Sequence, residues 1–115
     1  MLAIMTHVYL LLDATGSMLS QKQTAIDAVN EYFAGLREGP EAESILVSVG
    51  IFNSNIGMER VVDALPANSV RDITHEQYKP AGSTPLYDAI AQAVAQLETR
   101  PPEEAKVLVI QTDGE

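Results

Sequence analysis

Cysteine and tryptophan are absent from this sequence of 115 residues, and only 7 residues are Lys or Arg. Without cysteine the chain cannot form a disulfide, a zinc–thiolate site or a cysteine nucleophile. The 16 acidic residues give a net charge of -9, which argues against a nucleic-acid partner because binding to a phosphate backbone needs cationic side chains. We also expect a cytoplasmic location, since the lack of cysteine fits a reducing compartment.

A hydrophobic stretch long enough to span a membrane is also missing. The apolar N-terminal run MLAIMTHVYLLL is interrupted by Asp13, well short of the roughly 20 residues that a transmembrane helix needs. The run lacks the basic region and the small-residue cleavage site of a signal peptide. We therefore predict a buried strand here and no membrane partner, in a single domain over residues 1–115.

Short apolar runs without alternation predict strands over residues 8–12, 45–52 and 107–110. Such runs suit a parallel sheet, whose strands are covered on both faces. Residues 58–65 predict a further strand, and the charged residues Glu59, Arg60 and Asp63 place it at an edge. The short Asn-rich connection before it favours a hairpin, so this strand should run antiparallel to its neighbour.

Two helices are predicted between these strands, because apolar residues recur there at three- and four-residue steps. Gly39-Pro40 ends the first helix, and Pro85 suits the first position of the second. The predicted buried faces are Ile26, Val29, Phe33 and Leu36 in the first helix, over residues 22–36, and Leu86, Ile90, Val94 and Leu97 in the second. Strands and helices in this order predict an α/β fold with a central, mostly parallel sheet flanked by helices.

Polar residues gather where predicted strands end or a helix begins. Asp13, Thr15 and Ser17 follow the first strand, Thr84 precedes the second helix, and Asp113 follows the last strand. In open α/β sheets ligands bind outside the carboxyl ends of the strands, so these side chains should share one crevice. All their donor atoms are oxygens, which suit Mg²⁺, Ca²⁺ or Mn²⁺ better than zinc or copper.

The pattern resembles the metal-ion-dependent adhesion site of von Willebrand factor A domains, written Asp-x-Ser-x-Ser, then a distant Thr and a distant Asp. DATGSM resembles the bacterial or phage-like variant with Thr at the first Ser position, GSTPLYDAI resembles the threonine loop and its helix, and VLVIQTDGE resembles the strand and loop that bear the last Asp. The resemblance implies a Rossmann-like fold with Thr15, Ser17 and Thr84 as hydroxyl ligands. Asp13 and Asp113 would bind the metal directly or through water. Each of these residues alone also suits a turn or a helix cap, and the joint pattern favours the metal site.

The same resemblance implies a function. Members of this family mostly mediate protein–protein contacts and few are enzymes, so we expect a non-enzymatic module. Its bound Mg²⁺, Mn²⁺ or Ca²⁺ would capture an Asp or Glu of a partner protein. The family's domain normally continues with further strands and helices past the last Asp, so the resemblance covers a partial domain. We therefore expect the strand over residues 107–110 to be an edge that offers a surface for self-association.

An enzyme is the alternative interpretation. Phosphotransferases of the haloacid dehalogenase type also place a nucleophilic Asp after an apolar strand, and DATGS resembles one variant of their motif. Asp13 would then be the nucleophile and Asp113 a Mg²⁺ ligand. Thr15 stands where most phosphatases of this type have an acid, GSTPLYDAI has no place in their pattern, and their lysine has no single candidate here. These departures disfavour the enzyme.

The remaining polar residues are interpreted as structural. His7 and His75 lack an acid–nucleophile spacing that would predict catalysis. We expect Glu103 and Glu104 to be solvated surface charges, and Tyr78 to pack with its hydroxyl in water.

Overall fold

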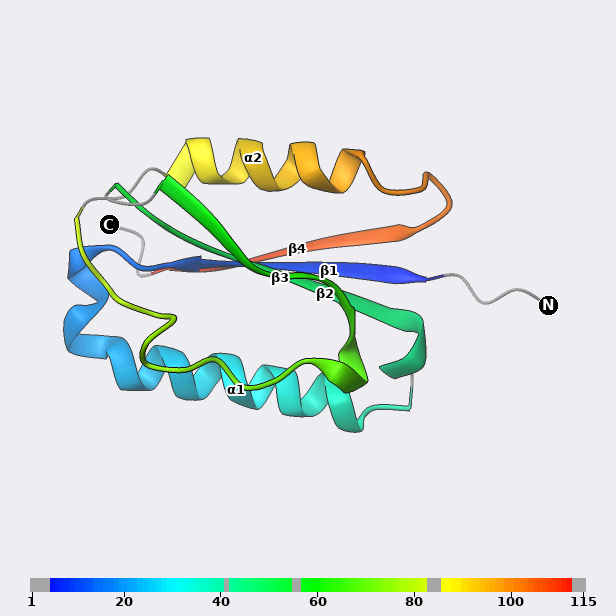
Figure 1. Cartoon of the computed structure of the whole chain (residues 1–115), viewed down its shortest axis with the longest axis horizontal. Helices are drawn as coiled ribbons and strands as arrows, with labels where there is room; N and C mark the ends of the chain where they lie inside the picture. Colours follow the sequence, from blue (N-terminus) through cyan, green and yellow to red (C-terminus); the bar gives the residue numbers. More distant parts are fainter. Residues whose placement is uncertain (1–4, 41, 55–56, 83–85, 113–115) are drawn as a thin grey trace.

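The computed structural model of this chain describes residues 5–40, 42–54, 57–82 and 86–112, apart from the side chains of Ser17 and Leu86. A single sheet lies between α1 on one face and α2 on the other (Figure 1). The elements are β1 (Thr6–Asp13), α1 (Lys22–Glu38), β2 (Ile45–Asn53), β3 (Gly57–Pro66), α2 (Leu86–Glu98) and β4 (Ala105–Gln111). Short 3-10 helices occur at Gly16–Gln21, Ala42–Ser44 and Ala67–Ser69.

The strand order is β3-β2-β1-β4, with β1 parallel to both β2 and β4 and with β3 antiparallel to β2. The predicted α/β fold with a mostly parallel central sheet is therefore confirmed, as is the edge hairpin strand. Asp13 lies in register with Phe52, and Leu12 with Gln111. The carboxyl ends of the parallel strands thus lie together at one end of the sheet, which we call the carboxyl edge. Their amino ends lie together at the opposite end, the amino edge.

The central strand β1 divides the hydrophobic core into two layers. Its residues from His7 onward are all buried, as its uninterrupted apolar run predicts. Leu10 and Leu12 face α1 and pack with Phe33. Tyr9 and Leu11 face α2 on the other side of the sheet.

The predicted buried face of α2 is confirmed at Leu97, and Ile90 packs against the same cluster, but the prediction is wrong at Val94. Val94 is 39% exposed, whereas Ala89 and Ala93 are buried together with Leu97. The small alanines lie in the same cluster as Tyr9 and Phe52, whose rings fill the space between helix and sheet. The large sheet residues therefore require small residues at these two helix positions, because a branched side chain there would overfill the space between α2 and the sheet.

Strand β3 bends beside Ser48, where its pairing with β2 shifts register between Val47 and Val49. Ala64 has a φ of 52°, in the left-handed region that a residue with a side chain adopts at a cost. None of the described helices is long and apolar enough to cross a membrane.

Candidate functional site

Asp13 ends β1, and its side chain is fully buried at the carboxyl edge of the sheet. Oδ1 accepts a hydrogen bond of 2.8 Å from the Thr15 N–H, and Oδ2 accepts one of 2.6 Å from the Thr112 hydroxyl. A buried carboxylate is tolerated only when its oxygens have such donors. The bond from Thr112 also ties the end of β4 to the end of β1.

A second loop packs against the loop that follows Asp13. The Gly16 N–H donates to the Gly82 carbonyl at 2.8 Å, and the Ala81 N–H donates to the Ala14 carbonyl at 2.8 Å. Gly82 has a φ of 72°, and a Cβ added to Gly16 would lie 3.2 Å from the Gly82 oxygen. Glycine at both positions therefore permits the close approach of the two loops.

Two side chains that were not predicted to belong to the site donate hydrogen bonds to the same loop. Asn53, at the end of β2, donates from Nδ2 to the Ala14 carbonyl at 3.0 Å. The Tyr78 hydroxyl donates to the Asp13 carbonyl, and Tyr78 is buried. The prediction of a Tyr78 hydroxyl in water was wrong, because the buried loop carbonyl needs a donor. Only the position of Asn53 at a strand end could have signalled its role.

The structure describes part of the predicted ligand set. Asp13 and Thr15 lie in the loop and are buried. Ser17 belongs to the 3-10 helix that follows, with its side chain outside the described residues, as are Thr84 and Asp113. Among the described residues, no group of His, Asp and Glu side chains gathers in a way that would hold a metal by itself. The ligand set therefore stays a prediction.

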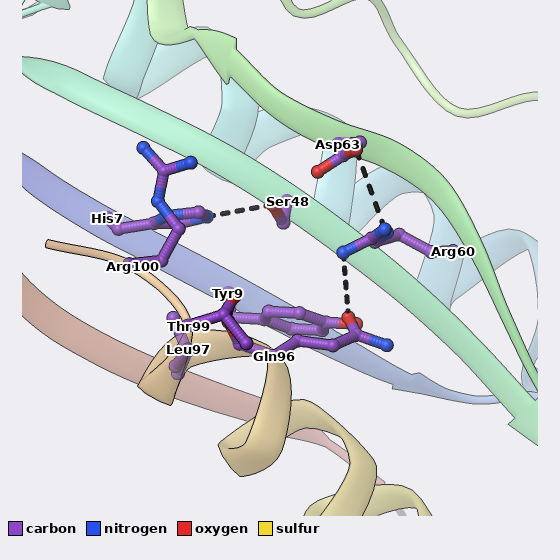
Figure 2. Close-up of a pocket in the computed structure, with 9 residues that line it drawn as sticks. All are labelled: His7, Tyr9, Ser48, Arg60, Asp63, Gln96, Leu97, Thr99 and Arg100. Atoms are coloured by element: carbon purple, nitrogen blue, oxygen red, sulfur yellow. Dashed lines mark hydrogen bonds and ion pairs between the residues drawn. The ribbon is translucent and has the colours of Figure 1, made fainter.

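A second polar cluster lies at the opposite, amino edge of the sheet. His7 Nδ1 is 3.1 Å from Glu104 Oε1. His7 Nε2 is 2.8 Å from Ser48 Oγ, a contact drawn in Figure 2. Arg100 donates to both Glu104 oxygens at 3.0 Å. The expectation that Glu104 is a solvated charge was therefore wrong, because the Arg100 fork and the His7 ring supply the partners that allow its burial.

These contacts change the pKa values of His7 and Glu104. Burial lowers the pKa of His7 below its ordinary value, and its bond with Glu104 opposes that effect. The hydrogen bonds from Arg100 lower the pKa of Glu104. Glu104, His7 and Ser48 follow the order acid, imidazole, hydroxyl that acyl-transfer enzymes use. Ser48 is only 1% exposed and its Oγ accepts the Ala64 N–H, so the hydroxyl is not presented to a substrate.

The fold and the carboxyl-edge loops define a Rossmann-type α/β domain whose polar turns converge on one buried acid. The family model of the von Willebrand factor type A domain matches residues 8–115, and the chain belongs to that family. The comparison with curated proteins gave no match.

Two solved structures are similar to this chain in fold. The pilus adhesin SpaC of Lactobacillus rhamnosus GG, in an open conformation, has 17% identity and a TM-score of 0.81 over 97% of this chain. The PilB minor pilin of Streptococcus sanguinis has 18% identity and a TM-score of 0.72 over 99% of this chain. The chain spans 15% and 31% of the lengths of those two chains, respectively.

Proposed function

We propose that this domain is a protein-binding module that depends on a divalent cation held at the carboxyl edge of the sheet. The main observation that supports this proposal is that three segments of the chain meet around Asp13. Thr15 and Thr112 donate to its carboxylate, and the 81–82 loop is hydrogen-bonded to the backbone of the turn directly after it. Gly82 and Thr112 lie directly beside the Thr84 segment and Asp113 in the sequence.

The donor chemistry of this edge fits Mg²⁺, with Mn²⁺ or Ca²⁺ as substitutes, because every available ligand atom is an oxygen. The hydroxyls of Thr15, Ser17 and Thr84 would be the direct ligands. Asp13 and Asp113 would supply the balancing charge. Since both Asp13 oxygens already accept hydrogen bonds, we favour a contact through water for this acid.

Neutral hydroxyl ligands would leave the bound ion with much of its charge. The ion would then attract a carboxylate from another molecule, so an exposed Asp or Glu of a partner protein is the proposed ligand. Family membership favours this binding role over the phosphotransferase alternative. The names pilus adhesin and minor pilin agree with a role in protein contact, by analogy of fold alone.

Calorimetric titration with Mg²⁺ and Mn²⁺ tests the proposal, with thermal melts on the same samples. The parent should bind the ions and melt at a higher temperature when they are present. Asp13→Asn should lose both effects while keeping its circular dichroism spectrum, and the exposed Asp27→Asn serves as the matched control. Binding by Asp13→Asn equal to that of the parent would contradict the ligand assignment.

We also propose that β4 mediates self-association. Among the described residues β4 lies at an edge of the sheet, and Val107 and Ile110 are 43% and 38% exposed. A cavity of about 370 Å³ beside it is lined largely by apolar side chains, including Tyr32, Val109 and Ile110. An apolar edge with unpaired backbone groups favours pairing with a second strand.

A further inference from the structure

With a neutral His7 ring, the hydrogen bonds around it have one arrangement that satisfies them all. Glu104 cannot donate as a carboxylate, so His7 Nδ1 must carry the hydrogen that joins them. In a neutral ring, Nε2 is then an acceptor, and the Ser48 hydroxyl donates to it. Ser48 Oγ in turn accepts the Ala64 N–H at 2.9 Å. Glu104, His7, Ser48 and Ala64 therefore form a relay in which each donor points the same way.

Ala64 is the strained end of this relay. Its φ of 52° lies where a side chain is disfavoured, at the bend of β3. The bond to Ser48 comes from a neighbouring strand, and it holds the Ala64 amide in that conformation. The bend should relax when this bond weakens.

A polar cavity of about 240 Å³ gives water access to the relay. His7 and Ser48 line it, and the charged residues Arg60, Asp63 and Arg100 lie around them in Figure 2. Arg60 contacts Asp63 and also donates to Gln96 of α2. Protons can therefore reach His7 without unfolding of the domain.

We propose that His7, Ser48 and Ala64 form a proton-operated latch at the amino edge of the sheet. When His7 takes up a proton, Nε2 becomes a donor and the His7–Ser48 hydrogen bond reverses. Ser48 Oγ then accepts from both His7 Nε2 and the Ala64 N–H, and its own hydrogen turns toward the cavity. Because Ser48 no longer donates to His7, its oxygen becomes a poorer acceptor for the Ala64 N–H. The Ala64 bond weakens and the bend of β3 loosens.

The charges that face His7 set the balance of the latch. Glu104 and Asp63 favour the protonated ring, whereas Arg100 and burial oppose it. The net direction is a pKa below the ordinary 6.5 of histidine, so the latch is closed at neutral pH and opens on acidification. This device is separate from the proposed metal site, and it operates without an ion.

Amide NMR and hydrogen exchange of the whole chain, recorded from neutral to mildly acidic pH, test the latch. The His7 ring signals and the Ala64 amide signal should move with one midpoint. Exchange at Ala64 is first corrected for its intrinsic pH dependence. It should then rise about tenfold for each unit by which the pKa of His7 is higher with the latch open than with it closed. The exposed His75→Gln is the matched control and should behave like the parent.

The variant Ser48→Ala removes the hydrogen bond to Ala64 but leaves His7 able to take up a proton. His7 should still titrate in this variant, while Ala64 exchanges rapidly at every pH. A parent in which His7 titrates but Ala64 protection stays constant would overturn the proposal. So would a His7 ring that stays neutral until the whole domain unfolds.

Discussion

At the scale of the residue, Asp13 shows that a buried carboxylate depends on two donors from different parts of the chain. Thr15 supplies one donor from the same turn, and Thr112 supplies the other from the end of β4. The second bond spans 99 residues of sequence and is a side-chain contact. It is therefore the one that a substitution can remove cleanly.

Thr112→Val keeps the shape of the side chain but removes the hydroxyl. It leaves Asp13 Oδ2 without this donor, so we expect a loss of about 1–3 kcal/mol in the free energy of unfolding. Urea unfolding followed by circular dichroism measures it. Thr24→Val, on the exposed face of α1, should change stability by less than about 0.5 kcal/mol. Equal effects of the two substitutions would mean that the Thr112 bond contributes nothing.

His7 and Glu104 predict a dependence of stability on pH. The pKa of His7 is lowered in the folded chain, so stability should fall as the pH drops below the ordinary 6.5 toward the folded pKa. The pKa of Glu104 is also lowered, so its stabilising contribution is present above the ordinary 4.5 and is lost as the pH falls through the folded value. Urea midpoints measured across this range should show both losses. His7→Gln should lack the first, and a parent midpoint unchanged down to pH 4.5 would contradict the His7 assignment.

At the scale of the element, α2 is held against the sheet by small residues. Ala93→Leu should destabilise the domain by about 1–3 kcal/mol, because the added carbons would collide with a filled layer. Val94→Leu, one position away on the exposed face, should be nearly neutral. Thermal and urea unfolding of both variants decides which face is buried. The opposite ranking would restore the face predicted from the sequence.

The elements themselves could be predicted because the signals are local. Continuous apolar runs mark β1, β2 and β4, and Gly39-Pro40 ends α1 close to where it was expected. The helical spacing correctly placed Leu97 on the buried face of α2, but the burial of Ala93 in place of Val94 was not predictable, because it depends on Tyr9 and Phe52 across the layer. The burial of Glu104 depends likewise on distant partners, and charge alone predicts exposure.

For the candidate site, the sequence predicted which loops meet but not what supports them. The turn after Asp13 and the loop before Thr84 do lie together, as Gly16 and Gly82 show. Asn53 had only its position at a strand end as a signal and Tyr78 had none, because their partners are backbone carbonyls, which carry no sequence signal. The ligand roles of Ser17, Thr84 and Asp113 stay predictions.

At the scale of the whole molecule, the exposed edge at β4 predicts association. The mean mass of the parent in sedimentation velocity should rise with concentration. Val107→Lys combined with Ile110→Lys should keep the chain monomeric, because charged residues protect an edge strand from pairing. Val94→Lys, a substitution of similar exposure on α2, should associate like the parent. A monodisperse parent at high micromolar concentration would contradict this prediction.

The position of β1 between β2 and β4 also constrains the order of folding. Among the strands that the structure describes, β1 comes first in the sequence and its neighbour β4 comes last, so Thr6 must wait for Ala105 to be synthesised. Contacts this distant in sequence slow folding, because a long loop must close before they form. On the ribosome the β1–β2–β3 portion should form early. The carboxyl edge around Asp13 should close only when β4 emerges, and until then the β4 side of β1 stays open to chaperones or to another chain.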